Sequence, residues 1–102
     1  MNFSLQDQNG RQMGFLVMLA DEDLPTQGQC MVKLMLDQEN MIHSPSATLL
    51  KNLQHQGTLQ WQFDGQRTLL TDHNNLILAT IREHLLTIEG TTFIMTDLTG
   101  IL

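Results

Sequence analysis

The residues of this sequence that could carry out acid–base or metal chemistry are four histidines and the carboxylates beside two of them. These form the pairs Asp72–His73 and Glu83–His84. A histidine next to a carboxylate can act as a general base, and both groups bind zinc. Six side chains are therefore candidates for a catalytic or ligand-binding pocket: His43, His55, His73, His84, Asp72 and Glu83. No two histidines have the spacing of a zinc motif or of one helix face, so surface positions are the favoured interpretation.

An acidic run, Asp21-Glu22-Asp23, is the other pattern that could bind a metal ion. Carboxylate oxygens suit calcium and magnesium, but the run lacks the spaced ligands and the turn glycine of a calcium loop. We interpret it as a solvated loop and predict no metal site.

Cys30 is the only cysteine, so it cannot form a disulfide within the chain. It alternates with Val32, Leu34 and Leu36 in a segment that is typical of a strand, which predicts a buried and unreactive thiol. Ser44 lacks the Gly-x-Ser-x-Gly surroundings of a hydrolase nucleophile, and the glycines are too scattered to form a phosphate-binding loop. We predict no catalytic residue and no cofactor, and favour a non-catalytic protein over an enzyme.

Composition favours one small globular domain over residues 1–102. Eleven acidic residues against five basic ones give a net charge of −6, which disfavours binding to nucleic acid or to an anionic membrane. A basic protein partner would complement this charge. The N-terminus lacks the basic start and the apolar run of a signal peptide, and with the single cysteine this favours a cytoplasmic location.

The strongest local pattern is a hairpin from Thr58 to Thr71. Leu59, Trp61 and Phe63 alternate with polar residues, and Asp64-Gly65 favours a tight turn. A two-residue turn would place Trp61 opposite Thr68. A three-residue turn with a bulge would place it opposite Arg67, and we prefer this register because it pairs Leu59 with Leu69.

The segment 75–89 has two interpretations. On a helical wheel its apolar residues Ile77, Leu78, Ile81, Leu85 and Ile88 form one stripe, and Gly90 could end a helix. Its threonines favour strands instead, with a turn at Glu89-Gly90 that would pair Leu86 with Phe93. We favour the helix.

The remaining segments favour four strands and one helix. A first strand begins near Phe3, an Asn-Gly turn follows, and a second strand covers 12–20 with apolar residues on both faces, which indicates that it is covered on both sides. A third strand covers 29–37. Ser44-Pro45 predicts the start of a helix over about 45–56, with Ala47, Leu50 and Leu53 at core spacing and Gly57 as the stop. Residues 91–98 read as a last strand.

This order of elements predicts an α+β fold, a mainly antiparallel sheet with helices at about 45–56 and about 75–89. The alternative is an all-β barrel or sandwich with a single helix, if 75–89 forms strands.

We expect a small acidic protein-binding module that acts as an adaptor, an inhibitor or immunity protein, or a factor like a secretion chaperone. Its predicted partner surface comprises Met13, Met31, Met35, Phe93, Ile94 and Met95. The segments Phe3–Gln6 and Thr91–Leu98 look like unprotected sheet edges, which predicts a homodimer. The alternative function is a small enzyme or ligand-binding domain that uses the histidines and carboxylates in a pocket.

Overall fold

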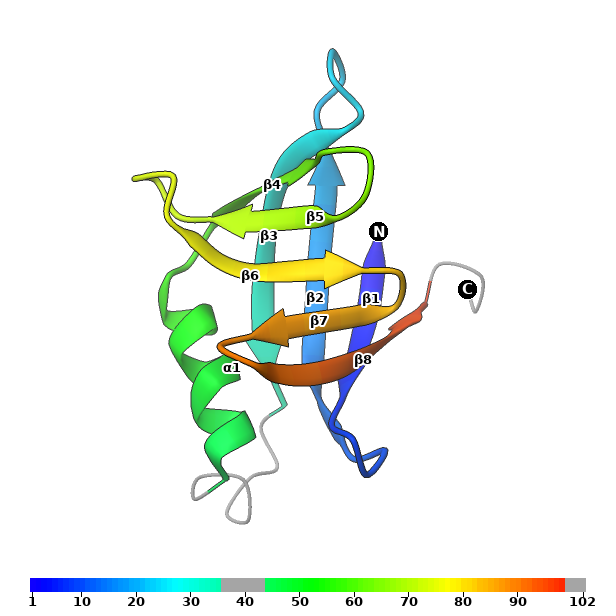
Figure 1. The fold of residues 1–102 in the computed structure, drawn as a ribbon, viewed down its shortest axis with the longest axis vertical. Coiled ribbons are helices and arrows are strands. Elements are labelled where there is room, and N and C mark those ends of the chain that lie inside the picture. The colour runs from blue at the N-terminus through cyan, green and yellow to red at the C-terminus, as the bar shows by residue number, and fades with distance from the viewer. Residues whose placement is uncertain (36–43, 99–102) are drawn as a thin grey trace.

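The computed structural model describes residues 1–35 and 44–98, and in this part of the chain eight strands form a closed barrel. The order of elements is β1 (Asn2–Gln6), β2 (Gln12–Ala20), β3 (Gln27–Leu34), α1 (Pro45–His55), β4 (Leu59–Phe63), β5 (Thr68–Thr71), β6 (Ile77–Arg82), β7 (Leu85–Ile88) and β8 (Thr91–Asp97). Each strand pairs antiparallel with the next in sequence. Strands β1 to β3 run across β5 to β8, so the sheet curls round on itself (Figure 1).

The pairing of β1 with β8 closes the barrel. Leu5 lies opposite Met95 and Gln6 lies opposite Ile94. The observed architecture contradicts the predicted α+β fold and agrees with the alternative, an all-β barrel with a single helix. The two segments that we expected to be free edges pair with each other, and closure is the arrangement that removes sheet edges. The edge argument for a homodimer is therefore lost.

The segment 75–89 forms β6 and β7 and not a helix, and its side chains alternate between buried and more exposed along the chain. The buried side chains are Ala79, Ile81, Leu86 and Ile88. Ile77 and Leu85 belong to the predicted helical stripe but are 49% and 43% exposed. Leu86 lies opposite Phe93, as the strand alternative requires. Strand pairing with β5 and β8 overrides the helical periodicity.

The β4–β5 hairpin is present, with a longer turn than either predicted register requires. Trp61 lies opposite Leu70, so the registers opposite Arg67 and opposite Thr68 are both wrong. The Asp64 N–H donates to the Arg67 carbonyl at 3.0 Å, and the Asp64 carboxylate accepts the N–H groups of the last two turn residues, each at 3.0 Å. The two bonds to the carboxylate, above all the one from the Arg67 N–H, hold the pKa of the exposed Asp64 carboxyl below its usual range.

Helix α1 begins and ends as predicted. The Ser44 hydroxyl accepts the Ala47 N–H at 3.4 Å, Pro45 starts the helix, and Gly57 follows it with a φ of 73°. Its buried side chains are Ala47, Leu50 and Leu53, which join the core of the barrel. Within the described ranges, no helix is long and apolar enough to cross a membrane.

Helix α1 lies beside the part of β3 that β4 leaves unpaired (Figure 1). The β3–β4 ladder ends at Cys30 and Leu59. Beyond it, the Gln54 side-chain oxygen of α1 accepts the Leu34 N–H. The helix thus supplies a side chain where a neighbouring strand would supply a carbonyl.

Apolar side chains fill the barrel. The largest fully buried ones are Phe93, Leu5, Met13, Leu16, Leu50, Leu59, Leu70 and Leu86. The interior of an eight-stranded barrel is just wide enough for side chains to fill it. The surface available for a functional site is therefore the outside of the barrel.

Candidate functional site

The two histidine–carboxylate pairs lie at opposite ends of one strand. Asp72 and His73 are in the turn before β6, and Glu83 and His84 are in the turn after it. The Asp72 carboxylate accepts two backbone N–H groups of its own turn, at 2.8 and 3.0 Å, so it stabilises that turn. The structure does not bring the two pairs together.

The remaining acid–base candidates that the structure describes are on other elements of the fold. His55 ends α1, and His43 falls outside the described residues. The run 21–23 forms the tip of the β2–β3 hairpin, where Asp21 accepts a bond of 3.2 Å from the Gln27 side chain. In the part that the structure describes, no three His, Cys, Asp or Glu residues are placed to hold a metal ion.

Cys30 is buried, as predicted, with 3% of its surface exposed. Burial disfavours the thiolate and raises the pKa of this thiol to about 12. At neutral pH the group is a protonated, enclosed thiol and not a nucleophile.

The predicted methionine and C-terminal partner surface is divided between the core and the outside. Three of its members are in the barrel interior: Met13, Phe93 and Met95, at 1%, 0% and 5% exposure. Phe93 and Met95 face inward because they alternate in β8 with residues that face outward. Met13 is the extra residue of a β-bulge, since β1 pairs Leu5 with Gly14 and Gln6 with Gln12. Met31 and Met35 are half-buried at the surface, and Ile94 is 37% exposed.

A row of apolar side chains lies on the outside of β2. Leu16 and Met18 are buried in the core, so the alternating residues Phe15, Val17 and Leu19 point outward. Phe15 is 37% and Leu19 is 61% exposed. Met31 of β3 lies directly opposite Val17 and extends the row sideways. We call these four residues the β2–β3 face.

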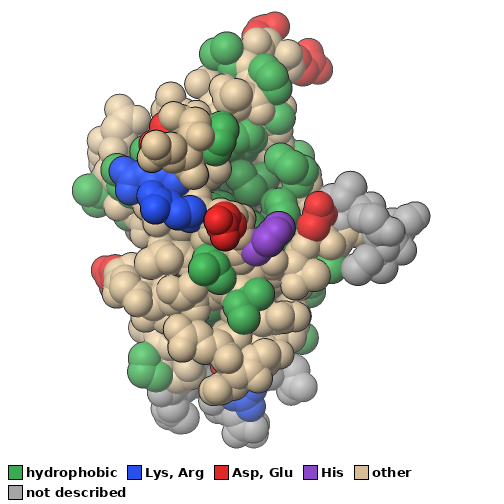
Figure 2. Space-filling model, turned by 45° about the vertical axis from the view of Figure 1, so that its right-hand side comes forward, with side chains coloured by type: hydrophobic (Ala, Val, Ile, Leu, Met, Phe, Trp, Pro, Cys, Tyr) green, Lys and Arg blue, Asp and Glu red, His purple; other side chains and the backbone are tan. Residues whose placement is uncertain are grey.

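The charged groups lie around this face and not on it. Strands β1, β2 and β3 contain no acidic residue and one basic residue, Lys33. In the described ranges, every acidic side chain is in a turn or is the last residue of a strand. Acidic groups gather at the tip at the top of the molecule, which is the β2–β3 hairpin (Figure 2). An acidic molecule thus presents an apolar wall without a carboxylate.

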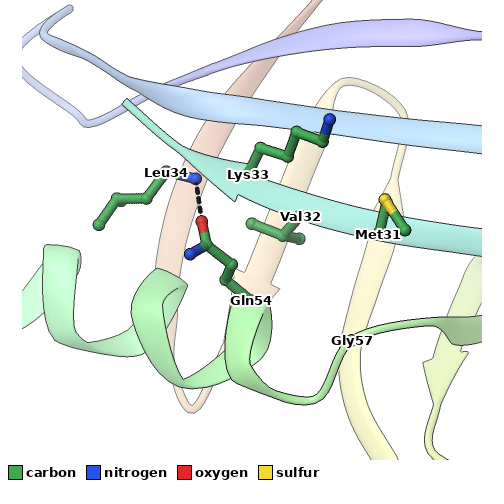
Figure 3. Close-up of a pocket in the computed structure, with 6 residues that line it drawn as sticks. All are labelled: Met31, Val32, Lys33, Leu34, Gln54 and Gly57. Atoms are coloured by element: carbon green, nitrogen blue, oxygen red, sulfur yellow. Dashed lines mark hydrogen bonds between the residues drawn. The ribbon is translucent and has the colours of Figure 1, made fainter. Parts of the chain in front are cut away.

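An open pocket of about 400 Å³ adjoins this face where β3 meets the C-terminal end of α1. Its lining is Met31, Val32, Lys33, Leu34, Gln54 and Gly57. Gln54 reaches from α1 to the backbone of Leu34, and the Lys33 side chain extends away from the helix (Figure 3). Met31 belongs to both the pocket and the β2–β3 face, so the two form one continuous surface.

Two glycines set the close approach of β2 to β3. A Cβ on Gly14 would lie 2.3 Å from the Lys33 carbonyl oxygen, and a Cβ on Gly28 would lie 1.8 Å from the Leu19 carbonyl oxygen. The Leu19 carbonyl also accepts the Trp61 indole N–H at 3.0 Å. The backbone beneath the face therefore tolerates no side chain at either glycine.

Comparison with protein families gives a match over the whole chain. The family model described as HLGFF-containing, Neisseriales, matches residues 1–102. The chain belongs to this family. Comparison with curated proteins and with solved structures found no match.

The string HLGFF in the description of this HLGFF-containing family does not occur in the chain. Two segments share a pair of adjacent residues with it. His84–Ile88 (HLLTI) shares the His-Leu pair, and Gln12–Leu16 (QMGFL) shares the Gly-Phe pair with apolar residues on either side of it. This Gly-Phe pair is Gly14, which has no room for a Cβ, and Phe15 of the β2–β3 face.

Phe15, Val17 and Leu19 were not among the predicted site residues. Their apolar character was visible, but it indicated a strand covered on both sides, whereas the outer side of β2 is open at Phe15 and Leu19. The sequence signal that could have found this face is that β2 is apolar on both sides, whereas a single core can bury only one of them. Gln54 carried no sequence signal, since its role depends on where the β3–β4 ladder ends.

Proposed function

We propose that this chain is a non-catalytic protein-binding module and that the β2–β3 face is its docking surface. The observation that carries the proposal is the half-exposed row of Phe15, Val17 and Leu19 on a wall without acidic residues. Large apolar side chains that stay exposed together commonly mark a binding surface.

The composition of this wall supports the proposal. Aromatic residues and methionine are enriched at the centres of interfaces, whereas charged groups occupy their rims. Val17 and Met31 lie at the centre here with Phe15 beside them, and the acidic tip lies at the edge. Burial of apolar surface contributes about 25 cal/mol per Å² before the costs of association. The acidic turns favour a partner that carries basic groups around an apolar patch.

The placement of the titratable groups supports a role without catalysis. A general base and its partner must lie within hydrogen-bond reach of one reacting centre. The pairs Asp72–His73 and Glu83–His84 are separated by the length of β6, and Cys30 is enclosed in the core.

Photo-crosslinking tests the docking surface. A photoreactive amino acid replaces Leu19 in one variant and Leu24 in a control, because Leu24 is equally apolar and 52% exposed but lies in the hairpin tip. In cells of a Neisseriales bacterium we expect position 19 to crosslink one protein that position 24 does not. A Phe15→Lys substitution should abolish that crosslink. Equal products at both positions, or none at position 19, would reject the surface.

Binding of a small apolar ligand is the second candidate function, and the pocket beside α1 favours it. Its volume of about 400 Å³ lies within the range of ligand sites. The lining contains apolar side chains, Lys33 and Gln54 but neither histidine nor carboxylate, which suits binding and not acid–base chemistry. A fragment screen by NMR would test it, with shifts expected at Met31 and Gly57 and not at the distant Gly65.

A further inference from the structure

We infer that the partner of the β2–β3 face is the same face of a second copy, with the two β2 strands antiparallel across a two-fold axis. This inference rests on the proposed function, because it names the occupant of that docking surface. Three features support it: the absence of acidic groups from the wall, the opposite charges at its two ends, and the spacing between them.

The absence of acidic groups makes this wall suitable for self-association. Two molecules of net charge −6 repel each other, and the repulsion is greatest where acidic groups meet. Strands β1 to β3 bring no carboxylate into a wall-to-wall contact. Apolar burial between two copies is therefore opposed least at this wall.

The two ends of the wall carry opposite charge. At one end are Lys33, opposite Phe15, and Arg11 in the turn before β2. Asp7 shares that turn, where its carboxylate accepts the N–H groups of Asn9 and Arg11, both at 2.9 Å. This end therefore carries two basic groups and one acidic group, a net positive charge. At the other end are the three exposed carboxylates of the tip, residues 21–23.

Strand spacing brings these ends together in the antiparallel arrangement. Residues on one face of a strand repeat about every 7 Å, so Phe15 and Leu19 lie one repeat on either side of Val17. With the two-fold axis at Val17, Phe15 of one copy meets Leu19 of the other. Lys33 then lies one repeat from Asp21 of the other copy, within reach of its side chain. A parallel stack would place the two acidic tips together, so charge selects the antiparallel arrangement.

The size of the wall predicts a weak dimer. Nine residues of β2 span about 30 Å, and three strands span about 14 Å, which gives a footprint of about 400 Å². Stable interfaces bury about 800 Å² from each partner. We therefore expect a concentration-dependent dimer at high micromolar concentration that weakens as salt is added.

Mixing two charge-reversed variants tests the arrangement. One variant is Lys33→Glu, and the other is the double substitution Glu22→Lys and Asp23→Lys, which keeps the Asp21–Gln27 bond. Each variant alone places like charges at both ends of the dimer, whereas the mixed pair has opposite charges at both ends. Lys51→Glu is the matched control, because it makes the same charge change on α1, away from the wall.

Sedimentation velocity across a dilution series gives the readout, with circular dichroism to show that each variant is folded. We expect each reversed variant alone to dimerise at least about tenfold more weakly than the wild type, the mixture to regain wild-type affinity, and Lys51→Glu to leave it unchanged. A wild-type monomer at high micromolar concentration, or a mixture no tighter than its components, would overturn the inference. If the wild type is a monomer but position 19 still crosslinks a different protein, the self-association is rejected and the proposed function stands. With neither dimer nor crosslink, both fail.

Discussion

At the scale of single residues, the outer wall of β1 to β3 depends on two glycines, whose lack of a side chain lets the strands approach each other. Gly14 and Gly28 leave room for the carbonyl oxygens of Lys33 and Leu19, so β3 can lie close against β2. Phe15 and Leu19 can then project outward from a rigid backbone. Residues held by a rigid scaffold lose little freedom when a partner binds.

Gly14→Ala should destabilise the protein by about 1–3 kcal/mol, because its Cβ would meet a backbone oxygen that can move only with the strand. Urea unfolding measures the change. Gln29→Ala, at an exposed position of the same sheet, is the control and should leave the midpoint nearly unchanged. An unchanged midpoint for Gly14→Ala would mean that β2 and β3 lie further apart than described.

Cys30 should make stability depend on alkaline pH. The unfolded thiol ionises near its ordinary pKa of about 8.5, whereas the folded thiol stays protonated up to a pKa of about 12. Above about pH 9 the unfolded state binds fewer protons, so the free energy of unfolding falls by at most about 1.4 kcal/mol per pH unit until pH 12. The chain has no tyrosine to titrate in this range.

Urea unfolding of the wild type and Cys30→Ala between pH 8 and pH 11 measures this dependence. The wild-type free energy of unfolding should fall more steeply with pH than that of the variant, whatever the offset caused by the smaller side chain. Parallel curves would show that the thiol ionises in the folded state as readily as in the unfolded state.

At the scale of elements, turn chemistry and strand partners divide the control of structure. The Asp64–Arg67 turn is held by the Asp64 carboxylate, and Gly65 adopts a φ of 101° within it. This turn also sets the register that places Trp61 opposite Leu70. One carboxylate and one glycine thus position the indole that bonds to the Leu19 carbonyl.

Gly65→Val should destabilise the hairpin by about 1–3 kcal/mol, because a β-branched residue is strained at positive φ. Gln66→Val is the control, since the next residue of the same turn is exposed and has no positive φ. The urea midpoint should fall for the first variant and change little for the second. A fall of equal size in both would mean that the side chain, and not the backbone conformation, causes the loss.

At the scale of the whole molecule, closure of the barrel decides which surfaces are available to a partner. With β1 and β8 paired, neither strand offers a free edge, and binding must use an outer wall or the region beside α1. In the described ranges, the acidic groups lie in turns or at the last residue of a strand. The wall of β1 to β3 therefore carries a single charge, that of Lys33, between charged turns.

Amide hydrogen exchange tests closure. The N–H groups of Leu5, Met95 and their neighbours in β1 and β8 should exchange as slowly as those of β4 and β5, because all four strands are paired on both sides. Rapid exchange at alternate residues along β8 would indicate an open edge. It would also restore the argument for edge-to-edge pairing.

Features governed by neighbouring residues could be predicted from the sequence alone. The helix from Pro45, capped by Ser44 and ended by Gly57, the limits of β2 and the burial of Cys30 follow from capping, turn chemistry and alternation. The tertiary structure alone decided that 75–89 forms strands, that β8 closes on β1, and that the two histidine–carboxylate pairs lie at opposite ends of β6. It also decided that the outer side of β2 is uncovered. Each of these depends on a partner strand or a neighbouring layer distant in sequence, and local periodicity carries no information about whether such a partner is present.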